Sequence, residues 1–177
     1  MRYVALLRGI NVGGNAKVEM PRLKTLFEKL GCKDVSTYIN SGNVIFTDSR
    51  SSSALSKNIE DEIEKEFGFR VPIVIRNQQN IAELNKKIPQ EWTNDEKIRT
   101  DVMFLWDEVD NPDILNKIKV NPDIEKATYL KGALVWSVGR QFVTRGGGIK
   151  LIKTDVYKYM TIRNINTVRK INELLQK

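Results

Sequence analysis

The hydrophobic positions of the first 75 residues alternate between strand spacing and helix spacing. Residues 2–10 are predicted to form a buried strand, because Tyr3 to Leu7 is a continuous apolar run. Leu23, Leu26, Phe27 and Leu30 then fall on one face of a helix that runs from about residue 20 and ends at Gly31. The remaining predicted elements are a hairpin over 35–40 and 44–47, a helix with Leu55, Ile59, Ile63 and Phe67, and a strand from Phe69 to Ile75. This β-α-β-β-α-β order is that of the ferredoxin-like split unit.

The second half of the chain predicts a similar order of elements. A short helix capped by Asn77 is followed by a polar stretch at 89–100, where we expect the boundary between two subdomains. The elements predicted after it are a strand at 102–106, a helix from Asn111-Pro112, a hairpin over 124–130 and 133–138, a flexible glycine loop at 145–148 and two helices near 150–159 and 166–176. The order is β-α-β-β-α-α, without an internal sequence repeat. We therefore predict an α+β fold of two ferredoxin-like (split βαβ) subdomains with mainly antiparallel sheets and C-terminal helices. They span residues 1–90 (βαββαβ) and 91–177 (βαββαα).

The composition narrows the class of protein. The chain has 177 residues, of which 41% are hydrophobic, and no apolar run approaches the ~20 residues of a membrane-spanning helix. The N-terminal apolar stretch stops at Arg8 and lacks the small-residue pattern of a signal peptide. Cys32 is the one cysteine, so no disulfide forms within the chain. These features together predict a cytoplasmic protein that does not enter membranes.

The absence of histidine excludes several kinds of chemistry. With no histidine, the chain holds neither a Ser-His-Asp nor a Cys-His catalytic group, and no histidine-ligated zinc. Cys32 alone does not build a thiolate metal site, although an oxygen-ligated Mg²⁺ site stays open because carboxylates are plentiful. We identify no metal ligand and no cofactor. Any enzyme built from this chain would use arginine, lysine, asparagine, serine and carboxylates, and the sequence leaves open whether it is an enzyme.

The net charge of +7 is distributed unevenly. Residues 140–177 contain nine Lys and Arg against two Asp and Glu, whereas residues 51–139 contain twelve against sixteen. A basic terminal segment attracts phosphates or nucleic acid. The alternative is an ordinary solvated helix face.

The first loop has the composition of a phosphate-binding loop. Arg8 to Lys17 follows a strand, leads to a helix and contains Gly9, Gly13 and Gly14. Glycine exposes backbone N–H groups, and a helix N-terminus favours anions. Gly9 and Gly14 have the spacing of P-loop glycines, but Asn15-Ala16 stands where that motif requires Lys-Ser/Thr. The alternative is a tight turn that needs glycine.

Topology brings a second loop to the same place. In a βαββαβ unit the first two strands run in one direction, so the glycine loop and the turn Asn40-Ser41-Gly42-Asn43 share one edge of the sheet. Loops gathered on a rigid edge are common positions for binding sites. The alternative is a pair of solvent-facing turns.

The segment from Thr161 to Thr167 is the third candidate. It precedes the last helix, so its asparagine and threonine residues are expected caps. Arg163 and Lys170 lie near the helix start and would hold an anion together with the helix N–H groups. The alternative is capping plus a solvated arginine.

Three stretches of the chain resemble a known family. They are Arg2-Tyr3-Val4-Ala5-Leu6-Leu7-Arg8-Gly9-Ile10-Asn11-Val12-Gly13-Gly14, Ser41-Gly42-Asn43-Val44-Ile45-Phe46 and Thr161-Ile162-Arg163-Asn164-Ile165-Asn166-Thr167. Together they resemble the bacterial domain-of-unknown-function family 1697, over nearly the whole chain. The resemblance implies two ferredoxin-like α+β subdomains and brings no established activity, substrate or cofactor.

The leading hypothesis is a binding or enzymatic site for a phosphorylated small molecule or nucleotide at the glycine-loop edge. The predicted ligand-binding residues are Arg8, Asn11, Gly13, Gly14, Asn15, Asn40, Ser41, Asn43, Arg163, Asn164, Thr167 and Lys170. One alternative is a nucleic-acid-binding module that uses the basic C-terminal helices, and another is a structural or partner-binding protein. In a structural role, Arg8 and Arg163 would pair with nearby carboxylates.

Overall fold

The computed structural model of the chain describes residues 1–13 and 16–177. The chain divides into two compact units. Unit 1 comprises Met1–Ile81 together with Ile171–Lys177, and unit 2 comprises Ala82–Lys170.

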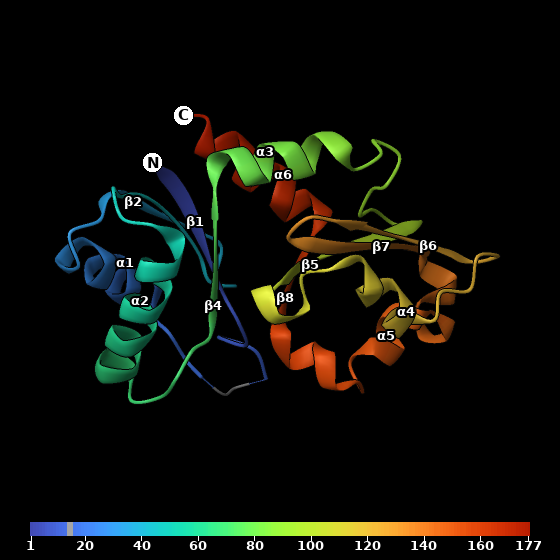
Figure 1. The fold of residues 1–177 in the computed structure, drawn as a ribbon, viewed down its shortest axis with the longest axis horizontal. Coiled ribbons are helices and arrows are strands. Elements are labelled where there is room, and N and C mark those ends of the chain that lie inside the picture. The colour runs from blue at the N-terminus through green and yellow to red at the C-terminus, as the bar shows by residue number, and fades with distance from the viewer. Residues whose placement is uncertain (14–15) are drawn as a thin grey trace. The chain divides into compact units, whose positions relative to one another are not determined.

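Unit 1 has the predicted ferredoxin-like topology. Its elements are β1 (Arg2–Leu7), α1 (Met20–Lys29), β2 (Lys33–Tyr38), β3 (Asn43–Thr47), α2 (Ser52–Phe67), β4 (Ile73–Asn77) and the start of α3 (Gln78–Lys87). The four strands form one sheet in the order β2-β3-β1-β4, and every neighbouring pair is antiparallel. Figure 1 shows α1 and α2 on one face of this sheet.

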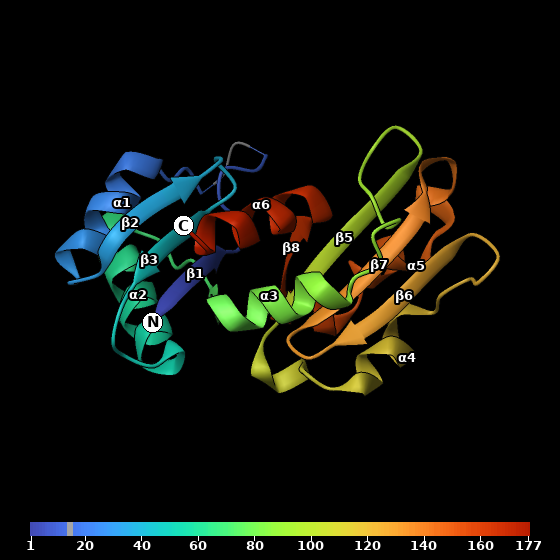
Figure 2. The same ribbon diagram turned by 90° about the horizontal axis from the view of Figure 1, so that it is seen from above.

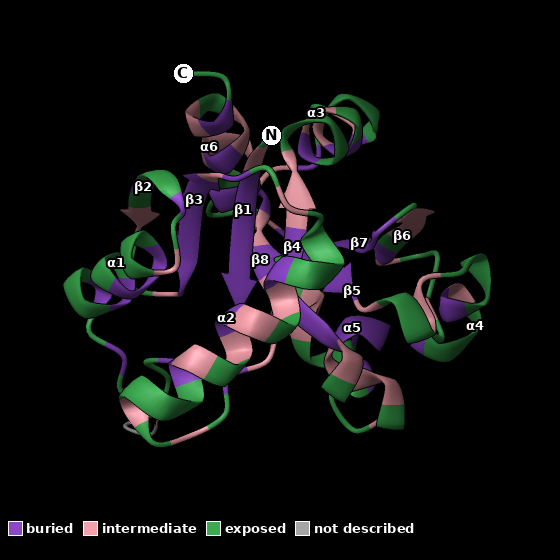
Figure 3. Ribbon diagram, turned by 60° about the vertical axis from the view of Figure 1, so that its left-hand side comes forward, coloured by how far each residue is buried: buried purple, intermediate pink, exposed green. Residues whose placement is uncertain are grey.

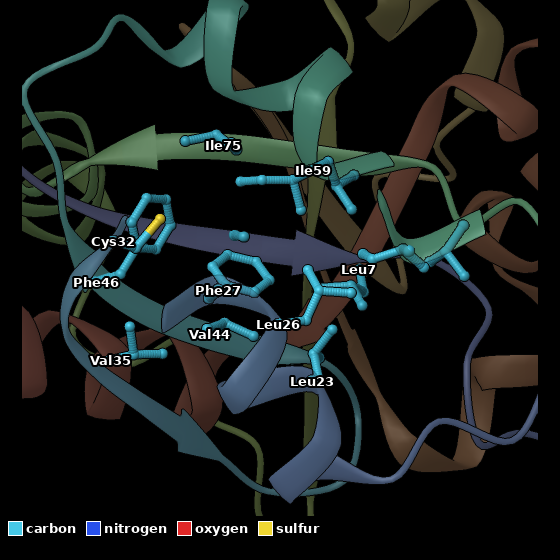
Figure 4. Packing of buried hydrophobic residues seen from close by; sticks show 14 of the residues in the cluster. Leu7, Leu23, Leu26, Phe27, Cys32, Val35, Val44, Phe46, Ile59 and Ile75 are labelled. Carbon is cyan, nitrogen blue, oxygen red and sulfur yellow. The ribbon is translucent and has the colours of Figure 1, made fainter. Parts of the chain in front are cut away.

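The core of unit 1 lies between that face and the two helices. Alternate residues of β1, Tyr3, Ala5 and Leu7, point into it, as the strand period requires. Phe27 of α1 meets Phe46 of β3 edge to face, with ring centroids 5.2 Å apart. Figure 4 shows these rings among side chains from both helices and from β1, β3 and β4. The central strands are buried along their length, whereas each helix has a buried and an exposed side (Figure 3).

Unit 2 repeats the same topology. Its elements are the rest of α3, β5 (Ile98–Leu105), α4 (Leu115–Ile118), β6 (Glu125–Leu130), β7 (Ala133–Gly139), α5 (Gly147–Leu151), β8 (Met160–Asn164) and the start of α6 (Ile165–Leu175), with short 3₁₀ turns at Asp107–Val109, Pro112–Ile114, Arg140–Arg145 and Asp155–Tyr159. The sheet order is β6-β7-β5-β8, again antiparallel throughout (Figure 2). The predicted α+β fold with two antiparallel, ferredoxin-like sheets is confirmed.

One predicted element of unit 2 is wrong. The sequence predicts a helix near 150–159 and no strand after it, but the helix ends at Leu151 and β8 follows at Met160–Asn164. β8 pairs with β5, so the order is βαββαβ followed by α6. Met160 and Ile162 face the core of unit 2, while Thr161 and Arg163 occupy the alternate positions. The alternation is present in the sequence, but it covers only four residues and runs directly into the helix-capping residue Asn164.

The glycine run at 146–148 is also not the flexible loop that the sequence predicts. All three glycines are buried. A Cβ on Gly147 would collide with the carbonyl oxygen of Ile118, and a Cβ on Gly148 would collide with the Trp136 indole. The run is glycine because other parts of unit 2 approach its backbone closely.

The two sheets share one sequence feature at equivalent positions. β4 ends in Ile75-Arg76-Asn77, and β8 ends in Ile162-Arg163-Asn164. In each, the arginine lies opposite a valine of the unit's first strand and donates Nη1 to the preceding carbonyl. The asparagine then caps the next helix, since Asn77 Oδ1 accepts from Asn80 N (2.8 Å) and Asn164 Oδ1 accepts from Thr167 N (2.9 Å). A short repeat therefore accompanies the repeated topology.

Candidate functional site

The glycine loop and the β2–β3 turn adjoin each other in unit 1, as the topology predicts. The backbone N–H of Leu7 donates to Gly42 O (2.8 Å), and Asn11 Nδ2 donates to Asn40 O (2.9 Å). Gly42 lies so close to the end of β1 that a Cβ there would stand 2.7 Å from Leu7 Cβ and 2.8 Å from Ile10 Cδ1. The turn is therefore anchored directly beside the loop.

The side chain of Asn11 holds the two ends of the glycine loop by hydrogen bonds. Its Nδ2 also donates to Val18 O (3.0 Å), and its Oδ1 accepts from Val18 N (2.9 Å), so the side chain joins both ends of the loop and the turn. Its φ of +55° lies in the left-handed region, which asparagine tolerates better than most residues. Among the predicted ligand residues, Asn11 is thus a positioning residue.

Asn43 has a similar internal role. It is fully buried, and its Nδ2 donates to Tyr38 O (2.9 Å) and to Ser41 Oγ (3.1 Å). These bonds fix the shape of the β2–β3 turn from inside. Asn40 is exposed and Ser41 is half-buried, so these two positions of the turn face outward.

The backbone of the glycine loop has an unusual conformation. Gly9 (φ +72°), Asn11 (φ +55°) and Gly13 (φ +63°) are left-handed, while the intervening Ile10 and Val12 are not. Alternation of left-handed with right-handed residues is one way in which a backbone forms a concave surface of N–H groups, and such a surface suits anions. Nothing lies within 4 Å of where a Cβ would stand on Gly9 or Gly13, so the surface there is open.

Two of the predicted ligand residues, Gly14 and Asn15, lie outside the described residues. Arg8 begins the loop, where it is half-buried, and its backbone N–H donates to Pro72 O (2.9 Å).

The third predicted segment lies in unit 2. Arg163 is only 6% exposed, and burial lowers the pKa of its guanidinium to about 10. Its Nη1 donates to Thr161 Oγ1 (3.0 Å) and to Ile162 O (2.8 Å). The expected capping by this segment is confirmed at Asn164, whose Oδ1 accepts from the backbone N–H of Thr167, and Lys170 is half-buried on α6. A pocket shared by all three predicted segments stays a prediction.

The basic residues of 140–177 divide into two groups. Arg140 and Arg169 donate to backbone carbonyls of the 89–95 segment, and Arg163 is buried. Lys170 is half-buried. Five other cations are exposed and form no ion pair with any residue of the described ranges. They are Arg145, Lys150, Lys153, Lys158 and Lys177.

The buried carboxylate of Glu125 is not among the residues that the sequence predicts for a site. Its oxygens accept from Asn121 N (2.7 Å), Gly147 N (2.8 and 2.9 Å) and Trp136 Nε1 (2.5 Å). This side chain is 3% exposed and holds α5 against the sheet of unit 2. The close spacing of the glycine run is the one sequence feature that hints at it.

Cys32 is unsuited to nucleophilic chemistry. It is 5% exposed, and burial, with help from the Asp48 carboxylate, raises the pKa of its thiol to about 11. Its Sγ donates to Asp48 Oδ2 (3.5 Å). Hydrogen bonds from Arg50 hold the pKa of Asp48 well below its usual range. The thiolate needed for attack is therefore scarce at neutral pH.

Neither a metal-binding cluster nor a membrane-spanning helix is found among residues 1–13 and 16–177. Within residues 1–13 and 16–177, no three cysteine or carboxylate side chains are grouped as metal ligands would be. No helix in the described part of the chain combines the length and the apolar character needed to cross a membrane.

Comparisons with known proteins give a family and a structural relative, both without an assigned activity. No curated protein matches the chain. The solved structure of the conserved bacterial protein SP0830 from Streptococcus pneumoniae matches with a TM-score of 0.85 and 29% sequence identity, over 98% of each chain. The model of the family described as "Protein of unknown function (DUF1697)" matches residues 1–136. Because this match covers more than half of the chain, the protein belongs to the DUF1697 family.

Proposed function

We propose that the glycine-loop edge of unit 1 binds a small phosphorylated molecule. The observation that carries this proposal is the alternation of left-handed residues at 9, 11 and 13 beside the anchored β2–β3 turn. Backbone N–H groups on such a concave surface stabilise phosphate oxygens without a side-chain cation. The N–H of Asn11 is bonded to Ala16 O, so the donors for a ligand come from around Gly9 and Gly13.

Charge and rigidity support the same site. Arg8 and Lys17 flank the loop, and the first 50 residues carry more basic than acidic side chains. The Asn11 bonds and the close approach of Gly42 hold Ile10 and Asn11 beside the turn. A ligand at this position does not have to order these residues first, which favours affinity.

A pair of glycine variants tests the proposal by calorimetric titration with ribose 5-phosphate and adenosine 5′-monophosphate. Gly9→Ala drives φ out of the left-handed region and misaligns the N–H groups, so binding should fall at least about tenfold. Gly68→Ala is the matched control, because Gly68 is also left-handed (φ +79°) and open, but ends α2. Both variants should lose similar stability, on the order of 1–2 kcal/mol. Equal binding by the two variants contradicts the site.

Arg8 provides a second test. Arg8→Gln should leave the melting temperature near that of the wild type and weaken phosphate binding, because the charge is lost and the polar side chain is kept. A marked fall in melting temperature with unchanged binding supports the structural alternative, in which Arg8 serves the fold.

The exposed basic segment favours nucleic acid as a second candidate ligand. Lys153 N donates to Lys150 O (3.1 Å), and residues joined by such a three-residue bond lie on the same side of the turn. Contacts with about four phosphates predict a slope of roughly −3 to −4 for the logarithm of duplex affinity against that of salt concentration. Lys150→Gln with Lys153→Gln should reduce the slope by about 2, unlike the exposed control Lys57→Gln. Negligible binding at ~50 mM salt contradicts this candidate.

A further inference from the structure

The glycine-loop edge also carries exposed apolar side chains. Within the described residues, only four large hydrophobic side chains are exposed, and two of them, Val12 (68%) and Ile39 (48%), belong to the two loops of this edge. Each is one residue away from the hydrogen-bonded pair Asn11–Asn40. The apolar contacts therefore adjoin the proposed anion site within unit 1.

Ile39 is held there against its own backbone preference. Its φ is +50°, in the left-handed region. A β-branched residue is a genuine outlier in that region, because its Cβ substituents crowd the backbone. Asparagine or glycine would meet the same turn geometry without strain. The turn thus keeps an isoleucine that neither packs in the core nor suits the backbone, which is common where a residue serves a ligand.

The nature of the apolar surface limits what it binds. Two branched side chains offer far less area than a stable protein interface, which buries about 800 Å² on each partner, so a small ligand suits them better than a protein does. A ligand that uses both the loop N–H groups and this contact carries a phosphate and a flat, weakly polar group. Sugar phosphates carry the first feature only, and nucleotides carry both.

We infer that the glycine-loop edge is a nucleotide site, in which the phosphate lies on the loop around Gly9 and Gly13 and the base lies against Val12 and Ile39. This inference rests on the proposed function and narrows its ligand class.

The test compares three probes on the full chain: inorganic phosphate, ribose 5-phosphate and adenosine 5′-monophosphate. The nucleotide should bind at least about tenfold more tightly than ribose 5-phosphate, because only the base contacts the apolar pair. In Ile39→Gly that preference should fall to threefold or less, while ribose 5-phosphate affinity stays unchanged. The melting temperature should rise in the same variant, because glycine relieves the left-handed strain.

Ile39→Asn is the second variant, since asparagine also tolerates the turn and keeps a side chain of moderate size. Ile152→Ser is the control, because Ile152 is 47% exposed and lies in unit 2, on the segment after α5. The control should leave the preference intact.

The outcomes distinguish the nucleotide inference from the phosphate site on which it rests. Equal affinity for the nucleotide and ribose 5-phosphate overturns the nucleotide inference and leaves the phosphate site standing. A preference that survives both Ile39 variants also overturns it, since the base then lies elsewhere. Failure of all three probes to bind overturns the phosphate site itself.

Discussion

Removal of the Asn11 side chain tests how the glycine loop is held in place. Asn11→Gly keeps the left-handed φ without strain and deletes three hydrogen bonds, two to Val18 and one to Asn40. The Val18 bonds are partly buried, and the Asn40 bond is exposed. A typical hydrogen bond contributes about 0.5–1.5 kcal/mol net, and water replaces the exposed one most easily. The expected loss of unfolding free energy is therefore about 2 kcal/mol.

For a chain of this size, about 2 kcal/mol corresponds to a fall of roughly 4–8 °C in melting temperature. Urea unfolding followed by far-UV circular dichroism measures the free energy, because the tryptophans, Trp92, Trp106 and Trp136, all lie in unit 2 and do not report on unit 1. The control is Asn40→Ala, because the bond from Asn11 goes to the backbone oxygen of Asn40 and survives the substitution. The control should change stability by less than about 0.5 kcal/mol. If Asn11→Gly changes it no more than the control does, the side chain does not hold the loop, and the argument for a preformed site fails.

Three further outcomes are expected elsewhere in the fold. Glu125→Gln should lower the unfolding free energy by about 3 kcal/mol, because the N–H donors of Asn121, Trp136 and Gly147 lose a charged acceptor. A loss below about 1 kcal/mol in urea unfolding contradicts a structural role for this carboxylate. Because the folded state lowers the pKa of Asp48, this carboxylate contributes stability that is fully present above its ordinary pKa of about 3.9 and is lost as the pH falls toward its pKa in the folded protein. The difference in unfolding free energy between wild type and Asp48→Asn should therefore be smaller at pH 3 than at pH 6. A difference that does not change with pH contradicts the pairing of Asp48 with Arg50. Cys32 should react with a thiol reagent at pH 8 far more slowly in the native protein than in urea, and equal rates would show that its thiol is neither buried nor raised in pKa.

The sequence predicts the topology of unit 1 because each of its elements has an uninterrupted period. The four-residue spacing of Leu55, Ile59 and Ile63 matches the buried face of α2, and Gly68 ends that helix in the left-handed conformation. The shared edge of the glycine loop and the β2–β3 turn follows from this topology alone.

Unit 2 shows where such patterns fail. β8 has five residues, and its alternation of Met160 and Ile162 with Thr161 and Arg163 is too short to stand out beside the capping residues that follow it. Its position becomes visible only when Ile162-Arg163-Asn164 is compared with Ile75-Arg76-Asn77 at the end of β4. The glycine run at 146–148 misleads for a different reason, since glycine that permits close packing and glycine that permits motion look identical in a sequence.

The roles within the candidate site also depend on contacts that no spacing predicts. Asn11 and Asn43 are polar, adjoin glycines and look like ligand residues, yet their amides bond to the protein's own backbone. The strained Ile39 was not a candidate, because an isoleucine beside a turn has no feature in the sequence that reveals its φ.

The central claim is that phosphate binds at the glycine-loop edge of unit 1, and backbone NMR of the ¹⁵N-labelled protein during titration with adenosine 5′-monophosphate tests it most directly. The account predicts saturable shifts that are largest at the amides of Gly9, Gly13, Ile39 and Gly42, and that vanish in Gly9→Ala but persist in Gly68→Ala. Shifts centred on Lys150 and Lys153, or no saturable shift at millimolar nucleotide, would contradict it.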